Sequence, residues 1–249
     1  MKAKFVFIVL LLLSVAAMPV VVSAQDGDPA GDVDVTSDGK AYKSYLAVPE
    51  GDGPFPAIIL IHSFRGLEEG YRTMTDNLAK EGFVVLAVGW QTFGQELADD
   101  VMMQLLNDSV TYLTARSDVD AERLGLTGFC AGGRYTMLML PQMKMFKAGV
   151  AWYGFPNNGT PPPASFIDQL DAPMLIIHGT EDQPSPIASI YEYATKLQSA
   201  GKTFELKVYS GEPHGFMIQN GQLRTDDVGT DAFNEMAEFF SRKLAPAAS

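Results

Sequence analysis

The chain has 249 residues, of which 47% are hydrophobic and 19% are charged. This length and balance exclude bulk disorder and suit one α/β domain built on a continuous core. Thirty acidic side chains against eighteen basic ones give a net charge of −12, which argues against nucleic acid as a partner.

Residues 1–24 have the layout of a secretory signal peptide. Two lysines open the segment, an apolar run extends from Phe5 to Val22, and small residues end it at Ala24. We therefore expect cleavage after Ala24 and a secreted or periplasmic, extracytoplasmic, mature protein. The alternative is an uncleaved anchor, because the apolar run approaches bilayer length.

The expected mature chain divides into two parts. Residues 25–38 are rich in Gly and Asp and predict a flexible lead-in, and residues 39–249 predict a single domain. Removing residues 1–24, which hold two lysines and no acid, leaves sixteen basic and thirty acidic side chains and a net charge of −14. We expect no stable membrane association after cleavage, and a monomer or weak dimer.

The rest of the chain alternates short β-branched runs with longer helical patterns, which is typical of parallel βαβ units. The expected strands are 42–48, 56–61, 83–88, 123–129, 149–153, 174–178 and 204–209. The expected helices are 71–81, 96–116, 131–140, 187–200 and 230–244. The connections are short, so the sequence predicts a mostly parallel sheet of about seven or eight strands, helices on both faces and no large cap.

The most informative segment is Gly-Phe-Cys-Ala-Gly-Gly, residues 128–133, between an expected strand and an expected helix. It is a Gly-x-nucleophile-x-Gly turn with Cys130 at the nucleophile position. Such a turn holds its nucleophile at positive φ, and glycines two residues away avoid collision. The following helix directs its N-terminus at the sulfur, and the N–H of Ala131 is an expected oxyanion donor. The alternative is a buried structural cysteine beside a tight turn.

Two further turns supply partners for the thiol. Asp182 lies just past the strand 174–178, and His214 follows the strand 204–209. The chain order nucleophile, acid, histidine is that of α/β-hydrolases. His214 would accept the thiol proton and pass it to the leaving group, and Asp182 would orient the imidazole. Glu181 is the close alternative for the acid.

The loop after the strand 56–61 is the place where this fold supplies its second oxyanion N–H, which we assign to Phe64. The three histidines of the chain, His62, His178 and His214, show no metal-ligand spacing. We therefore expect no metal.

These residues resemble the dienelactone hydrolase family over about residues 56–244. The resemblance rests on the cysteine turn and on five further segments: His62 to Leu67, Leu78 to Ala87, Trp152-Tyr-Gly154, His178 to Asp182 and His214-Gly-Phe216. It implies an α/β-hydrolase fold and hydrolysis of small carboxylic esters or lactones through a thioester on Cys130, with no cofactor.

The sequence departs from the family pattern at two positions. The family usually carries Glu directly after the loop histidine, where this chain has Ser63. The family member that acts on dienelactone holds the substrate carboxylate with arginines, and residues 89–93 of this chain contain none. We therefore expect neutral substrates. The candidate pocket residues are His62, Ser63, Arg65, Trp90, Arg134, Trp152, Tyr153 and Phe216.

Two other classes of function remain as alternatives. A hydrolase fold that has lost turnover would be a non-catalytic binding protein, which Ser63 favours and the intact Cys, Asp and His oppose. A thiol redox protein usually needs a resolving cysteine, and this chain has a single cysteine.

Overall fold

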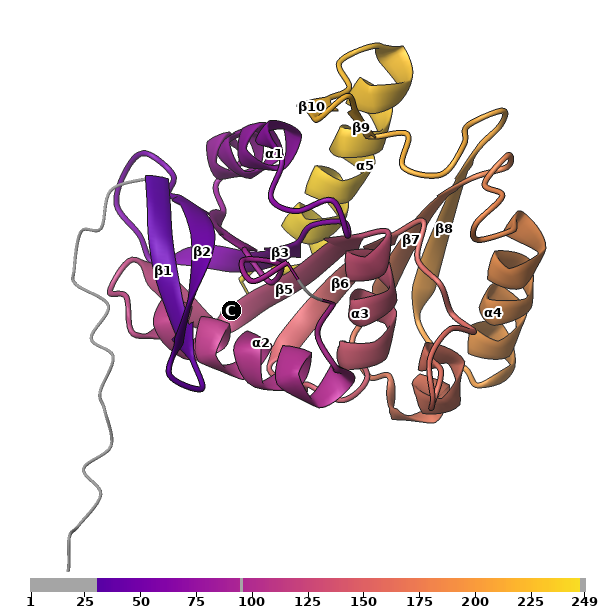
Figure 1. Cartoon of the computed structure of the whole chain (residues 1–249), viewed down its shortest axis with the longest axis horizontal. Helices are drawn as coiled ribbons and strands as arrows, with labels where there is room; N and C mark the ends of the chain where they lie inside the picture. Colours follow the sequence, from indigo (N-terminus) through magenta and orange to yellow (C-terminus); the bar gives the residue numbers. More distant parts are fainter. Residues whose placement is uncertain (1–30, 95, 247–249) are drawn as a thin grey trace, which may run out of the picture.

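The computed structural model describes residues 31–94 and 96–246. The expected signal peptide, residues 1–24, and the first part of the expected lead-in lie outside these ranges. The described chain is one α/β unit with a central sheet and helices on both faces (Figure 1).

The central sheet has eight strands in the order β1-β2-β4-β3-β5-β6-β7-β8. The strands are β1 (Gly31–Ser37), β2 (Lys40–Ala47), β3 (Phe55–Ile61), β4 (Val84–Val88), β5 (Val119–Phe129), β6 (Phe146–Trp152), β7 (Met174–Gly179) and β8 (Phe204–Tyr209). β2 runs antiparallel to both of its neighbours, β1 and β4. The strands from β3 to β8 are parallel to one another. The prediction of a mostly parallel sheet of seven or eight strands is confirmed.

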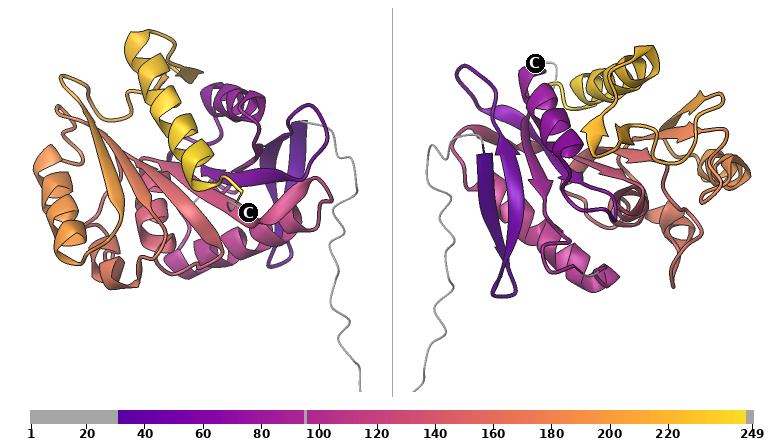
Figure 2. Two further views of the ribbon diagram at one scale, coloured as in Figure 1. Left: turned by 180° about the vertical axis from the view of Figure 1, so that it is seen from behind. Right: turned by 45° about the horizontal axis from the view of Figure 1, so that its top comes forward.

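Five α-helices cover the two faces of this sheet. They are α1 (Glu69–Lys80), α2 (Asp99–Thr114), α3 (Ala131–Met139), α4 (Ile187–Ser199) and α5 (Asp227–Lys243). Buried residues of α1 and α5 share one hydrophobic cluster, and those of α2, α3 and α4 share the other. Figure 1 and the two views of Figure 2 show the same division, with the two groups of helices on opposite sides of the strands.

The central strands explain why both faces are covered. β4 is buried along its whole length, as are the last five residues of β3. A strand that is apolar on both faces must have helices packed on both, as in parallel sheets. The layered arrangement therefore follows from the strand composition.

The expectation of a flexible lead-in is wrong for its second half. Gly31–Ser37 forms strand β1, which pairs with β2 from Gly31 opposite Leu46 to Ser37 opposite Lys40. Val35 and Ser37 are buried while Asp34 is exposed. Alternating side chains of this kind suit an antiparallel strand with one solvated face, and the pairing with β2 outweighs the low β-propensity of Gly and Asp.

Within residues 31–94 and 96–246, no large domain covers the carboxyl ends of the strands. The connection from β6 to β7 is described throughout, and it contains one short 3₁₀ helix (Pro163–Gln169). A small hairpin of β9 (Ile218–Gln219) and β10 (Gln222–Leu223) contacts α1. Among the described helices, none combines the length and the apolar composition that a membrane crossing requires.

Candidate active site

Three turns at the carboxyl ends of the parallel strands bring the candidate residues together. Cys130 follows β5, Asp182 follows β7 and His214 follows β8. Open α/β sheets bind ligands at this end, because loops from neighbouring strands converge there. The position of the site is therefore set by the direction of the strands.

The turn that holds Cys130 is strained. Its φ of 58° and ψ of −112° lie in a region that non-glycine residues rarely occupy. A Cβ on Gly128 would lie 2.1 Å from the carbonyl oxygen of Gly132, and one on Gly132 would lie 2.1 Å from that of Ile61. Only glycine allows this approach, so the backbone of the turn presents the cysteine side chain beside the start of α3.

Asp182 is the carboxylate that meets the histidine. It is buried, its Oδ2 accepts a hydrogen bond from Nδ1 of His214 at 2.7 Å, and its Oδ1 accepts one from the N–H of Ser185 at 2.8 Å. Glu181 is exposed, and its backbone N–H donates to the carbonyl of Glu212. The geometry thus places Asp182, and not Glu181, against His214.

His214 is in an environment that favours its protonated form. Burial acts to lower its pKa, but the hydrogen bond to Asp182 and the interaction with Cys130 outweigh burial and raise the pKa to about 9. Its Nε2 is buried and has no hydrogen-bond partner of normal geometry in the described part of the chain. This nitrogen is therefore available for a proton from the thiol.

His178 contacts the turn that carries Asp182. It is fully buried, its Nε2 donates to the carbonyl of Ser185 at 2.8 Å, and the same nitrogen lies 3.4 Å from Oδ2 of Asp182. Burial lowers the pKa of His178, so the ring is neutral at pH 7. His178 holds the turn that carries Asp182.

The two expected oxyanion donors border the cysteine turn. Neither the N–H of Phe64 nor that of Ala131 donates to a backbone carbonyl within residues 31–94 and 96–246. Ala131 is the first residue of α3, where N–H groups have no partner within the helix. Both groups are therefore free to bind a negatively charged oxygen.

A small pocket of about 120 Å³ is lined by both Cys130 and His214. Its lining residues come from four loops, from α1 and from β9: Ser63, Phe64, Arg65, Glu68, Tyr71, Cys130, Tyr153, His214, Gly215 and Ile218. Three of the predicted pocket residues, Ser63, Arg65 and Tyr153, are in this set. The space suits a small acyl group.

Four other predicted pocket residues do not line this pocket. His62, Trp90, Trp152 and Phe216 are each no more than 1% exposed, and they belong to the packed interior beneath the site. His62 stacks on Trp90 with ring centroids 5.3 Å apart, and the Trp90 indole N–H donates to the His62 carbonyl at 3.0 Å. Burial lowers the pKa of His62 to about 4. The structure places these four side chains in the interior, which the sequence could not show because a strand-end position does not give the direction of a side chain.

Arg134 is also outside the pocket of Cys130. Its guanidinium forms two hydrogen bonds with the carboxylate of Asp99, at 2.6 and 2.8 Å, and a third with the carbonyl of Asn158 at 2.9 Å. It borders a separate cleft of about 360 Å³ together with Ala131 and Phe155. The arginine links α2 to α3 and to the loop after β6.

The sequence reasoning missed several residues that line the pocket. Tyr71 and Glu68 come from the start of α1, and Ile218 comes from the β9–β10 hairpin. Tyr71 is almost fully buried and follows the apolar face of α1. Tyr71 is the first residue of the helix expected over 71–81, and no sequence signal separated it from its neighbours.

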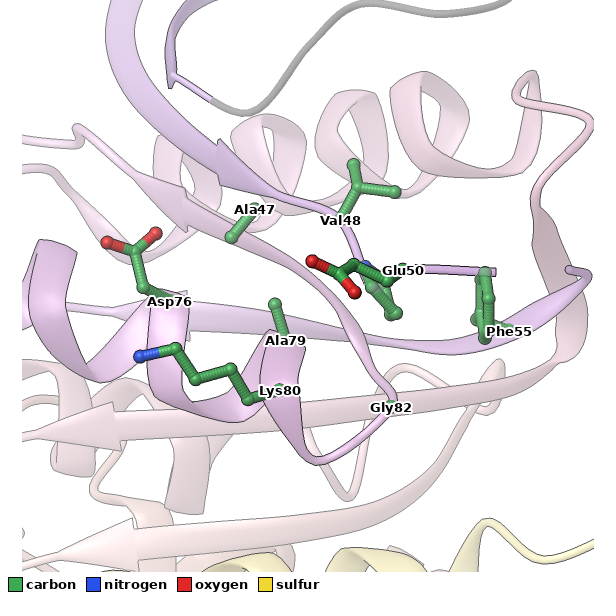
Figure 3. A pocket seen from close by; sticks show the side chains of 9 residues that line it. Ala47, Val48, Glu50, Phe55, Asp76, Ala79, Lys80 and Gly82 are labelled. Carbon is green, nitrogen blue, oxygen red and sulfur yellow. The ribbon is translucent and has the colours of Figure 1, made fainter. Parts of the chain in front are cut away.

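A larger groove lies at the other end of the sheet. It has a volume of about 570 Å³ and is bordered by Ala47, Phe55, Lys80 and Gly82, which lie at the end of β2, the start of β3 and the end of α1 (Figure 3). It contains none of the proposed catalytic side chains. Among the described residues, no group of three or more His, Cys, Asp or Glu side chains could hold a metal ion.

Comparison with known proteins supplies the family. The model of the dienelactone hydrolase family matches residues 42–244. The chain belongs to the dienelactone hydrolase family. It is therefore a hydrolase of the dienelactone hydrolase type, with an α/β-hydrolase fold.

Relatives and a solved structure agree with this assignment. A protein of Methylorubrum extorquens, provisionally named carboxymethylenebutenolidase, is 29% identical over 91% of this chain and 85% of its own length. A Bradyrhizobium protein, provisionally named 2-oxo-3-(5-oxofuran-2-ylidene)propanoate lactonase, is 28% identical over 74% of this chain and 82% of its own. A crystal structure from Klebsiella pneumoniae, provisionally named dienelactone hydrolase, has a TM-score of 0.77 and 26% identity and covers 86% of this chain and 98% of its own.

Proposed function

We propose that this member of the dienelactone hydrolase family cleaves small, neutral carboxylic esters or lactones through a thioester on Cys130. The observation that carries the proposal is the hydrogen bond of 2.7 Å between Nδ1 of His214 and Asp182, in a site where His214 and Cys130 line one pocket. A nucleophile, a base and an orienting carboxylate in this relation are the parts of a catalytic triad. The names of the relatives support lactones and esters as the substrate class.

The chemistry has two halves. The Cys130 sulfur, whose proton is held by Nε2 of His214, attacks the carbonyl carbon, and the N–H groups of Ala131 and Phe64 bind the resulting oxyanion. The tetrahedral intermediate collapses to a thioester, and His214 gives its proton to the departing oxygen. Water then attacks the thioester with His214 as base, which releases the carboxylic acid and returns the thiol.

The charges around the pocket favour neutral substrates. Arg65 and Glu68 both border the pocket, so their charges oppose each other. Arg134, the other arginine near the cysteine turn, is held by Asp99 in a bidentate pair. The net charge of −12 of the whole chain adds a weak bias against anions.

Replacement of Cys130 by Ala tests the mechanism. We expect hydrolysis of p-nitrophenyl acetate by the folded Cys130→Ala protein to fall by on the order of 10³-fold or more, because the covalent nucleophile is lost. Circular dichroism and thermal unfolding would show whether the variant is folded. Turnover close to wild type in a folded variant would refute the thioester.

We also propose that the protein is exported and that its mature form begins at Gln25. The layout of residues 1–24, with lysines, an apolar run and small residues before Gln25, supports this. Intact-mass measurement of protein from culture medium or periplasm should give the mass of residues 25–249. An uncut chain in the membrane fraction would instead indicate an anchor.

A further inference from the structure

Tyr153, the residue after β6, is held in an unusual backbone conformation. Its φ is +34°, a value that aromatic residues rarely adopt, and its N–H donates to the carbonyl of Ile177 at 2.8 Å. Strain of this kind lowers stability and persists where the surrounding structure enforces it, which is common at ligand sites. The conformation places the side chain of Tyr153 against His214.

The ring of Tyr153 is packed against His214 and Phe216. Its centroid lies 5.1 Å from that of His214 in an edge-on arrangement and 5.6 Å from that of Phe216. Tyr153 lines the 120 Å³ pocket together with Cys130 and Tyr71. The tyrosine therefore borders the space in which the thioester would form.

The hydroxyl of Tyr153 is buried, and no group in residues 31–94 or 96–246 forms a hydrogen bond of normal geometry with it. The backbone N–H of Met217 acts on its oxygen without reaching that geometry, and burial raises the pKa of the phenol well above its ordinary value. The hydroxyl thus keeps its proton. A buried hydroxyl without a partner is costly, and native proteins rarely retain one.

The second tyrosine of the pocket differs from Tyr153 in this respect. The hydroxyl of Tyr71 interacts with the side chain and backbone of Ser63, and burial raises the pKa of Tyr71 above its ordinary value. Ser63 in turn accepts a hydrogen bond from the N–H of Arg65 at 3.2 Å. Of the two tyrosines that line the pocket, Tyr153 is the one whose hydroxyl donor is unpaired in the described residues.

The acyl part of a substrate is the part that this donor would meet. Cys130 lines the small pocket and does not line the separate cleft of about 360 Å³ beside Ala131 and Arg134. Because the acyl group stays bound to Cys130 in the thioester, it occupies the small pocket, and the leaving group has the wider cleft available.

We infer that Tyr153 is a specificity-determining residue whose hydroxyl donates a hydrogen bond to an oxygen atom carried by the acyl group of the substrate. This inference rests on the proposed function and extends it from small neutral esters to oxygen-bearing ones. A site built to pair with a substrate oxygen discriminates against the analogue that lacks it, because the buried donor is then left unpaired.

Three p-nitrophenyl esters of similar size test the inference. The butanoyl ester has no acceptor beyond the ester itself, and the methoxyacetyl and 3-oxobutanoyl esters add an ether or a ketone oxygen. We expect Tyr153→Phe to lower kcat/KM for an oxygenated ester on the order of tenfold more than for the butanoyl ester. Comparing wild type with variant for each ester cancels the intrinsic reactivity of the esters. An equal change for all three esters would overturn the inference.

Tyr193 provides a matched control. It lies on α4, it is also buried, and its hydroxyl likewise has no hydrogen-bond partner in the described chain. Neither Tyr153→Phe nor Tyr193→Phe should lower the Tm, because each removes an unpaired buried hydroxyl and nothing else. Only Tyr153→Phe should change the preference among the esters. A fall in Tm with no change in preference would mean that the hydroxyl of Tyr153 is structural.

Binding without turnover separates this inference from the proposed function. If wild type hydrolyses none of the three esters, the proposed function fails while the donor can still be examined. Methyl methoxyacetate and methyl butanoate would be titrated by ligand-observed NMR into Cys130→Ala and into Cys130→Ala with Tyr153→Phe. Selective loss of methyl methoxyacetate binding in the double variant supports the donor, and equal binding of that ester to both proteins overturns it.

Discussion

The two ends of the central sheet differ in the volume of their cavities and in the hydrogen bonding of their polar side chains. The amino end has the larger hollow, the groove of about 570 Å³ in Figure 3, and the carboxyl end has a pocket of about 120 Å³ around Cys130. In the groove, Asp76 accepts a hydrogen bond from the hydroxyl of Tyr45 at 3.0 Å, and Lys80 donates one to Asn77 at 3.2 Å. At the carboxyl end, Nε2 of His214 and the hydroxyl of Tyr153 have no partner in the described residues.

Backbone strain follows the same division. Four described non-glycine residues have positive φ: Asp38, Cys130, Tyr153 and Asn220. Asp38 and Asn220 lie in hairpin turns, where Asp and Asn adopt this conformation at little cost. Cys130 and Tyr153 gain no such local compensation, and both lie at carboxyl ends of neighbouring strands. Strained non-glycine residues outside hairpin turns therefore lie at the carboxyl end of the sheet, and the larger volume lies at the amino end.

The largest effect that would test this contrast comes from three carboxylate replacements. Asp182→Asn should lower kcat/KM for p-nitrophenyl acetate by about 10²-fold or more, because the amide no longer holds the imidazole or stabilises its charge. Asp76→Asn in the groove and Glu181→Gln beside Asp182 should change it by less than about twofold. A comparable loss in either control would remove the distinction between the two ends or between the two acids.

A smaller effect is expected from a charge added at each end. Ser63→Glu places a carboxylate in the pocket of Cys130, where it disfavours a negative sulfur by repulsion. We expect alkylation of Cys130 by iodoacetamide near neutral pH to slow on the order of tenfold. Asn77→Asp adds the same charge near the groove and should leave the rate unchanged. Equal rates for all three proteins would show that the side chain at position 63 does not act on the thiol.

A further effect concerns stability and pH. The pKa of His214 is raised from 6.5 to about 9 in the folded protein, so its protonated form adds stability that is complete below pH 6.5 and is lost as the pH rises through 9. Between pH 6 and 9.5, urea unfolding of wild type should therefore lose on the order of 2 kcal/mol relative to His214→Gln. A constant difference between the two proteins over this range would contradict the raised pKa.

The sequence was sufficient for the fold and for placing Cys130, Asp182 and His214 after strands at one end of the sheet. The cysteine turn, the order of Cys130, Asp182 and His214, and their places after strands all follow from local patterns that this fold repeats. β1 was missed because Gly and Asp resemble a linker until a partner strand is present. Trp152 was assigned to the pocket and is interior, while Tyr71 was not assigned and lines it, because side-chain direction depends on tertiary packing.

The crowding around Cys130 has a consequence for protein engineering. A Cβ on Gly132 would meet the carbonyl oxygen of Ile61 at the end of β3, and one on Gly133 would lie 2.3 Å from that of Trp152 at the end of β6. The ends of three strands therefore approach one another at positions where only glycine fits. We expect no active clones from a library that varies these glycines. Phe64, which is 58% exposed at the rim of the pocket, can be varied without disturbing this contact, since the role proposed for it uses its main-chain N–H. A search for altered substrate range would therefore begin at Phe64.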